Sequence, residues 1–249
     1  MIRSKVRFRM KNNHIVKDAF ILSAGLGKRL LPYTKYNPKP LVPINEKPMI
    51  EYILDALFDI RIRNIYINTY YLSDQIEKYF QTKGLTNVHI KMESELLDTG
   101  GGVKSGLGEE YSDPIFIINC DALVLQNYSR LLSELRDNFI PSDMDAILAL
   151  SKVSDAIGYS GSGDFYLGKN NILESEKKIS NKYVFMGISI LNPIALRLTD
   201  KKKFSLIEIW KKLIFDKKCY GRMYYNKWCH TGTSQSLDYA DKFFREQNS

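Results

Sequence analysis

The sequence predicts an α/β fold of three layers with a mostly parallel, Rossmann-like central sheet. From Asp18 onward, strand patterns and helix patterns alternate along the chain, and this alternation is typical of a parallel sheet covered on both faces. Residues 115–119 form an apolar run of the kind that is buried on both faces of such a sheet. Glycines follow the first strand pattern directly, at the edge where open α/β sheets bind ligands.

The first half of the chain begins with a short apolar strand at 19–22, which ends at Ser23-Ala24-Gly25. An irregular loop follows as far as Glu46. Pro48 suits the first turn of a helix, and apolar residues recur at helical spacing from 49 to about 60. We expect further strands at 65–68, 88–92 and 115–119, a helix at 74–80, and a short helix that follows the glycines at 100–102 and ends near 108.

The second half begins with a helix at 129–138 and a strand at 145–150. A stretch rich in glycine and serine at 158–163 then marks a change to hairpin-like strands, expected at 164–167 and 183–191. Two helices, at 204–215 and 234–247, complete the chain. We therefore expect one domain at 18–249, preceded by a flexible basic arm at 1–17.

The composition is that of an ordinary globular protein, with 249 residues, 44% hydrophobic and 26% charged residues, and a mean hydropathy of −0.27. No run of 18 apolar residues is present, which excludes a transmembrane helix and argues against a membrane partner. Three cysteines without a CxxC spacing indicate neither a disulfide framework nor a zinc site. We expect a cytoplasmic protein, either a monomer or a small homo-oligomer.

The net charge of +8 does not indicate nucleic-acid binding, because it is concentrated at one end. Residues 1–17 hold six of the 36 basic residues and no acid, so the remaining 30 face 28 acidic residues. A duplex-binding protein needs a basic face on its globular part. We interpret the run 201–203 as solvated lysines, and we expect no nucleic-acid partner.

The most informative segment is 22–43, which reads LSAGLGKRLLPYTKYNPKPLVP. Gly25 and Gly27 allow a tight turn that brings backbone N–H groups against a polyphosphate, and Arg29 and Lys39 add cations for phosphate oxygens. A P-loop is excluded, since it would need glycine at position 22 and serine or threonine at position 29. A dinucleotide fingerprint fits poorly, because Leu30 stands where its third glycine would fall.

This segment resembles the sugar-1-phosphate nucleotidyltransferase family, whose signature is G-x-G-x-R-[LM]-x-P-x-T followed by P-K-P-L. The resemblance extends over nearly all of 18–249. It implies a single Rossmann-like nucleotidyltransferase domain that joins a nucleoside triphosphate to a sugar 1-phosphate and releases pyrophosphate. It also implies that Arg29, Lys39 and Asp121 are catalytic. The implied nucleotide-binding residues are Ala24, Gly25, Gly27, Lys28, Arg29, Lys39, Glu93, Thr99, Gly100 and Gly101.

The same resemblance assigns base recognition to the loop that runs from Glu93 to the triple glycine. Glu93 would meet the edge of the nucleobase, while the glycine backbone packs over the ring. A carboxylate can accept the N3–H of a pyrimidine, which is consistent with uracil or thymine. The alternative is a surface loop with two solvated glutamates.

Two positions would bind the cofactor, Mg²⁺, in this family. Asp121 follows the strand 115–119 and matches the family's metal-binding aspartate, although a strand-end aspartate can also simply cap a loop. His230 stands where the family has a second aspartate or an asparagine. Because imidazole suits Mn²⁺, Co²⁺, Fe or Zn²⁺ better than Mg²⁺, His230 indicates either a changed metal preference, with Mn²⁺ possible, or a degraded site.

Within the family, the chain is most similar to the uridylyltransferases that act on N-acetylmuramate 1-phosphate in cell-wall recycling. That similarity would place Gly163, Asp164 and Gly187 near the sugar. Mannose-1-phosphate guanylyltransferases and hexose-1-phosphate uridylyl- or thymidylyltransferases share most of these features and remain alternatives. A non-catalytic protein that binds nucleotide or sugar phosphate is a further alternative, which the histidine at position 230 motivates.

Overall fold

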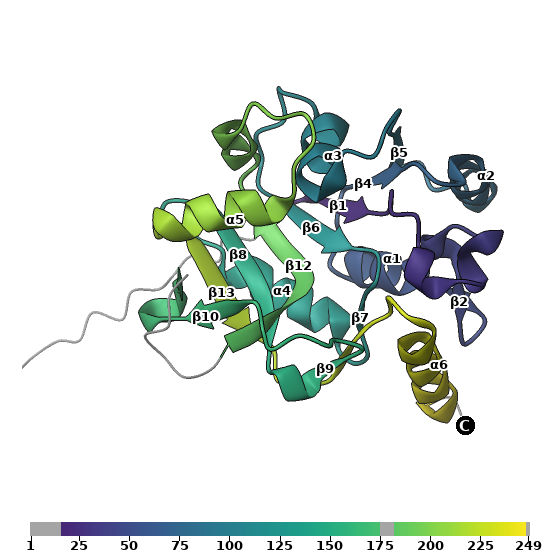
Figure 1. Cartoon of the computed structure of the whole chain (residues 1–249). Helices are drawn as coiled ribbons and strands as arrows, with labels where there is room; N and C mark the ends of the chain where they lie inside the picture. Colours follow the sequence, from purple (N-terminus) through teal and green to yellow (C-terminus); the bar gives the residue numbers. More distant parts are fainter. Residues whose placement is uncertain (1–15, 175–181, 248–249) are drawn as a thin grey trace, which may run out of the picture.

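The computed structural model describes residues 16–174 and 182–247, and it has a nine-stranded central sheet (Figure 1). Seven strands follow the order β11-β10-β12-β6-β1-β4-β5, and β8 pairs with both β12 and β13. The strands are β1 (Asp18–Leu22), β4 (Asn64–Thr69), β5 (Val88–Met92), β6 (Ile115–Asn119), β8 (Ala146–Ser151), β10 (Phe165–Leu167), β11 (Leu173–Glu174), β12 (Lys182–Leu191) and β13 (Cys219–Met223).

The half of the sheet that contains β6, β1, β4 and β5 is parallel throughout, because β1 pairs in parallel with β4 and β6, and β4 with β5. The long strand β12 runs antiparallel to β6 and β8, while β13 returns parallel to β8. The predicted fold class, a Rossmann-like sheet that is mostly parallel, is confirmed. The parallel half ends in one common edge, where the carboxyl ends of its strands meet.

Helices cover both faces of this sheet, which gives the three expected layers (Figure 1). On one face, side chains of α1, α2 and α4 pack on Ala19 and Ile21 of β1. On the other face, α3 and α5 pack on Phe20 of the same strand, because successive side chains of a strand point to opposite faces. The helices are α1 (Met49–Asp59), α2 (Ser73–Lys83), α3 (Asp98–Leu107), α4 (Tyr128–Asn138), α5 (Leu206–Phe215) and α6 (Ser234–Gln247).

Two small sheets join distant parts of the chain. Strands β7 (Ala122–Val124), β14 (Trp228–His230) and β9 (Ala156–Ile157) form a three-stranded sheet in the order β7-β14-β9. Strands β2 (Pro43–Ile44) and β3 (Lys47–Pro48) form a hairpin in the loop after β1. A third apolar cluster, which includes Leu30 and Leu237, fixes this loop to α6. The sequence pattern did not predict these short strands or β13.

The structure corrects one predicted element. The glycines Gly100–Gly102 were expected to precede a helix, but they lie inside α3, in its first turns. The cause is tertiary packing: a side-chain carbon on Gly100 would lie 2.3 Å from the ring of Phe204, and one on Gly101 would lie 2.3 Å from the carbonyl oxygen of Lys202. The glycines therefore allow α3 to approach the segment that precedes α5.

At the beginning of the described chain, Val16 is 2% exposed and belongs to the core. The carbonyl oxygen of Lys17 accepts a hydrogen bond from the backbone N–H of Arg63. These two residues of the predicted arm are therefore packed, and the rest of that arm, residues 1–15, lies outside the described part. Over 16–174 and 182–247, none of the helices has the length and apolar character needed to cross a bilayer.

Candidate active site

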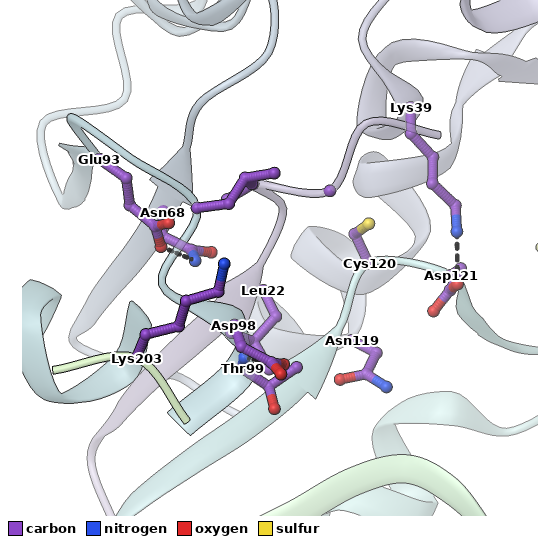
Figure 2. Close-up of a pocket in the computed structure, with 13 residues that line it drawn as sticks. Leu22, Lys39, Asn68, Glu93, Asp98, Thr99, Asn119, Cys120, Asp121 and Lys203 are labelled. Carbon is purple, nitrogen blue, oxygen red and sulfur yellow. Dashed lines mark hydrogen bonds and ion pairs between the residues drawn. The ribbon is translucent and has the colours of Figure 1, made fainter. Parts of the chain in front are cut away.

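A cavity of about 420 Å³ opens at the carboxyl edge of β1, β4 and β6, where the sequence predicted ligand binding. Figure 2 shows the two ends of this cavity. Lys39 and Asp121 lie at one end, and Glu93, Asn68 and Lys203 lie at the other. The residues that line the cavity are Leu22, Ala24, Gly25, Lys39, Asn68, Glu93, Leu96, Asp98, Thr99, Asn119, Cys120, Asp121 and Lys203.

At the first end, three side chains meet around one carboxylate. The ammonium of Lys39 forms an ion pair with Oδ2 of Asp121, and Nε2 of His230 lies 3.1 Å from the same oxygen. The side chains of Lys39 and Asp121 are 11% and 13% exposed, and that of His230 is 25% exposed. Three sequence-predicted residues are thus brought into one partly buried cluster.

The cluster is assembled by the small sheet. Asp121 directly precedes β7, and His230 ends β14, where it pairs with Ala122. The backbone N–H and the hydroxyl of Thr231 both donate to the carbonyl oxygen of Asp121, at 3.0 and 3.2 Å. Lys39 arrives from the 3₁₀ helix Lys39–Leu41, whose fixed start at Pro38 and Pro40 reduces the freedom of the chain there.

Asp121 is ionised in this arrangement. Burial by itself would raise its pKa, but the neighbouring charge of Lys39 and the hydrogen bond from His230 outweigh burial and hold the pKa far below its usual range. Cys120, which also lines the cavity, behaves oppositely, since burial raises the pKa of its thiol to about 12. A thiol that stays protonated is a poor nucleophile, so Cys120 is poorly suited to attack a substrate.

Arg29 reaches the same region from the outside. A side-chain carbon placed on Gly232 would lie 3.2 Å from Nε2 of His230 and 3.3 Å from Nη2 of Arg29, so the guanidinium and the imidazole flank that glycine together. Arg29 and its neighbour Lys28 are exposed, and neither lines the cavity. Arg29 therefore stands at the rim, next to the cluster around Asp121.

The two glycines of the first motif have different surroundings. Gly25 lines the cavity, and no atom lies within 4 Å of the place where its side chain would begin, so its backbone is open to a ligand. Gly27 has φ of 63°, and a side chain there would lie 2.7 Å from Cγ2 of Thr34. Its carbonyl oxygen accepts the Thr34 hydroxyl at 2.8 Å. Gly27 thus shapes the loop, while Ala24 and Gly25 face the cavity.

At the second end, Glu93 is held by two donors. Its Oε1 accepts from the amide of Asn68 at 2.7 Å, and its Oε2 accepts from the backbone N–H of Leu97 at 3.1 Å. Asn68 in turn accepts the backbone N–H of Ser23 at 2.8 Å. Since each carboxylate oxygen has two lone pairs, the carboxylate of Glu93 can still accept from a ligand. Asn68 fixes it relative to the loop after β1.

Of the three residues that the family resemblance placed near the sugar, Gly187 lies beside the cavity, whereas Gly163 and Asp164 do not line it. Gly187 has φ of 75°, and a side chain there would lie 2.8 Å from the amide nitrogen of Asn119, which lines the cavity. Gly163 and Asp164 are not among the lining residues. The carboxylate of Asp164 accepts from the Tyr159 hydroxyl at 2.9 Å and from the backbone N–H of Phe185 at 2.8 Å, and so ties β10 to β12.

The donor set around Asp121 fits a divalent cation that takes most of its ligands from elsewhere. In the described part of the chain, no three histidine, cysteine, aspartate or glutamate side chains form a cage that could hold a metal. Mg²⁺ commonly binds through one or two carboxylates, with substrate phosphates and water as its other ligands. Asp121 offers one such carboxylate, and His230 adds an imidazole nitrogen 3.1 Å from it, a ligand that Mn²⁺ accepts more readily.

Several lining residues were not predicted as site residues, among them Asn68, Asn119 and Lys203. Asn68 and Asn119 lie at the carboxyl ends of the buried strands β4 and β6. A polar residue at the end of an apolar strand is a sequence signal that could have predicted both as site residues. Lys203 is exposed like its two neighbours, as expected for solvated lysines, but it also lines the cavity, whereas Lys201 and Lys202 pair with surface glutamates. No local pattern distinguishes it from its neighbours.

The known proteins that this chain resembles are nucleotidyltransferases. The model of the nucleotidyl transferase family matches residues 18–247. The chain is 28% identical, over 88% of its own length and 93% of the relative's, to N-acetylmuramate alpha-1-phosphate uridylyltransferase of Caulobacter vibrioides. It is 33% identical to D-glycero-alpha-D-manno-heptose 1-phosphate guanylyltransferase of Aneurinibacillus thermoaerophilus, over 55% of the chain and 59% of that relative.

Among solved structures, inositol-1-phosphate CTP transferase from T. maritima superposes with a TM-score of 0.73. That superposition covers 93% of this chain and 96% of the other, at 16% identity. At this identity the likeness concerns the fold alone. It agrees with the Rossmann-like architecture described above.

Proposed function

Because the chain belongs to the nucleotidyl transferase family, we propose that it joins UTP to N-acetylmuramate 1-phosphate and releases pyrophosphate. The class of reaction, nucleotidyl transfer to a sugar 1-phosphate, is supported by the family and by relatives that share it. The uridylyltransferase that matches over 93% of its own length supports the particular substrates. The proposed role is the reuse of a cell-wall sugar in the cytoplasm.

The observation that carries the proposal is the division of the cavity into two ends (Figure 2). Glu93 at one end has acceptor capacity for the N3–H of a pyrimidine. Lys39 at the other end supplies a cation for phosphate oxygens, and the open backbone at Gly25 also lines the cavity. A nucleoside triphosphate that lies along the cavity would meet a base-binding end and a phosphate-binding end.

The reaction is proposed to proceed in one displacement. An oxygen of the sugar phosphate forms a bond to the α-phosphorus while the bond from that phosphorus to the bridging oxygen of the β-phosphate breaks, and pyrophosphate leaves. The attacking oxygen is already ionised, so no general base is required. Lys39 is proposed to neutralise charge around the α-phosphorus, and Arg29 at the rim to stabilise the leaving pyrophosphate.

Asp121 and His230 are the residues that would hold a divalent cation, Mg²⁺ or Mn²⁺, together with phosphate oxygens. Such a cation, when bound, would add positive charge between the two substrates. Asp121 stays ionised at neutral pH because Lys39 and His230 hold its pKa low. It is therefore ready to accept a cation without first losing a proton.

The relative that transfers guanylyl groups makes GTP the second candidate, since guanine presents an N–H beside a carbonyl oxygen, as uracil does. The test is pyrophosphate release with four nucleoside triphosphates against a panel of sugar 1-phosphates, each with Mg²⁺ and with Mn²⁺. UTP with N-acetylmuramate 1-phosphate should give the highest kcat/KM. A clear preference for GTP would reject the uridylyl assignment, and nucleotide binding without turnover of any sugar phosphate would favour a non-catalytic role.

A further inference from the structure

The segment before α5 is bound tightly to the loop that carries Glu93, although about a hundred residues separate them in the chain. The backbone N–H of Phe204 donates to the carbonyl oxygen of Leu97 at 3.2 Å. The carbonyl oxygen of Phe204 accepts from the N–H groups of Gly100 and Gly101, at 2.9 and 3.0 Å. Since a side chain on either glycine would collide with this segment at 2.3 Å, the glycines fix its position against the cavity.

This attachment orients three consecutive lysines differently. Lys201 pairs with Glu208 at 2.7 Å, and Lys202 pairs with Glu95 at 2.6 Å, both on the exposed surface. Lys203 lines the cavity, and Figure 2 shows its ammonium pointing into it, on the side of Glu93 and Asn68. Within 16–174 and 182–247, it takes part in none of the hydrogen bonds or ion pairs.

Four backbone donors of the neighbouring loop are already used. The N–H of Leu97 donates to Glu93, the N–H of Thr99 donates to the carboxylate of Asp98 at 2.6 Å, and those of Gly100 and Gly101 donate to Phe204. A carbonyl oxygen of a base that approached Leu97, Thr99, Gly100 or Gly101 would therefore meet backbone N–H groups that already have acceptors. Lys203 is a donor that remains free there.

We propose that Lys203 is a specificity-determining residue of the nucleotide site, which donates to a carbonyl oxygen of the base while Glu93 accepts the adjacent ring N–H. This rests on the proposed function. Uracil offers both groups, as N3–H and its 4-carbonyl oxygen. Cytosine has an unprotonated N3 and an amino group instead, so it would set an acceptor against the Glu93 carboxylate and a donor against the Lys203 ammonium.

The position of Lys203 indicates the base rather than the phosphates as its partner. Lys39 with Asp121 occupies the opposite end of the cavity (Figure 2). Asp98 and Thr99, which lie between Glu93 and the triple glycine in the sequence, line the cavity together with Lys203. Figure 2 shows the ammonium of Lys203 on the same side of the cavity as Glu93, which is 8% exposed.

The test is the binding of UTP and of CTP, without sugar phosphate, to the native protein and to Lys203→Met, which keeps the length of the side chain and removes the charge and the donors. Lys201→Met is the matched control, and Lys203→Arg tests rescue. We expect the native preference for UTP over CTP to fall about ten- to hundredfold in Lys203→Met, through weaker UTP binding. Lys203→Arg should restore part of it, and Lys201→Met should leave it unchanged.

An equal loss of affinity for both nucleotides in Lys203→Met would overturn the assignment, because it would mean a contact with phosphate or ribose. An unchanged preference would overturn it too, as it would leave Lys203 a surface residue. If the native protein binds both nucleotides equally, base reading by Lys203 is wrong while the proposed transfer reaction can stand. If it binds neither, the proposed function fails together with the assignment.

Discussion

Asn68 connects the two loops that border the proposed base-binding end of the cavity, and its removal should weaken the whole fold. The side chain accepts the N–H of Ser23 at 2.8 Å and donates to Glu93 at 2.7 Å, and Asn68 is 3% exposed. Asn68→Ala leaves a buried N–H without an acceptor, which costs about 1–3 kcal/mol. The change also removes one of the two protein donors to the carboxylate of Glu93, and a hydrogen bond of this kind is worth about 1.5–3 kcal/mol.

Because the cavity lies beside Glu93, water can replace part of the second bond, so we expect a total loss of about 2–4 kcal/mol in the free energy of unfolding. For a domain of this size, that corresponds to a decrease of about 4–16 °C in Tm. Urea unfolding followed by the fluorescence of Trp210 and Trp228, both 2% exposed, measures it.

The next residue along β4 provides the matched control. Thr69 is fully buried, and its hydroxyl has no hydrogen-bond partner in the described structure. Thr69→Val keeps the shape and removes an unsatisfied polar group, so it should leave the stability unchanged or raise it by about 1 kcal/mol. A loss below about 0.5 kcal/mol for Asn68→Ala, or an equal loss for Thr69→Val, would refute the reasoning about Asn68.

Six other changes test other parts of the structure. Lys39→Ala and Arg29→Ala should each lower the rate of pyrophosphate release about 10²–10³-fold, and native-like turnover in either would remove its assigned role. His230→Asp should raise turnover with Mg²⁺ and reduce the relative gain from Mn²⁺; a lower rate with Mg²⁺ would make the imidazole a working part of the site. Burial alone would raise the pKa of Glu51, but the nearby Lys83 and Tyr79 lower it overall. The stability that the native protein has over Glu51→Gln should therefore be complete above pH 4.5 and decline as pH falls below that value, and a difference that grows in acid would contradict this sign. Deletion of residues 1–15 should leave turnover nearly unchanged, whereas a deletion that also removes the buried Val16 should lower Tm; silencing by the shorter deletion would show that the arm is needed.

The larger elements could be predicted from the sequence because local patterns determine them. The strand at 18–22 and the helix at 49–59 differ from their predicted bounds by one residue at one end, since an apolar run and a proline mark them locally. The short strands β7 and β14 have three residues each and pair with each other across more than a hundred residues. Nothing within three residues specifies such a partner, and the pairing depends on the tertiary fold.

The site residues also divide into those that a local motif predicts and those that only the folded chain brings into place. The sequence motifs predicted Lys39, Asp121 and His230 as separate site residues, and the structure brings their side chains together. Lys203 could not be predicted, since its two neighbours are also lysines and only the attachment of Phe204 to the triple glycine distinguishes them. The triple glycine was recognised, but the reason for it, close packing of a distant segment, is a property of the folded chain.

Both ends of the cavity are completed by the last fifty residues of the chain. At the base-binding end, the N–H of Leu206 donates to the Thr99 hydroxyl across a separation of 107 residues. At the phosphate-binding end, His230 reaches Asp121 across 109 residues. The parallel half-sheet supplies the edge at which the cavity opens, while these later segments bring Lys203 into its lining and His230 against Asp121. On the roles proposed for Lys203 and His230, substitutions in these two segments would alter base or metal preference without disturbing the apolar pattern that specifies the sheet.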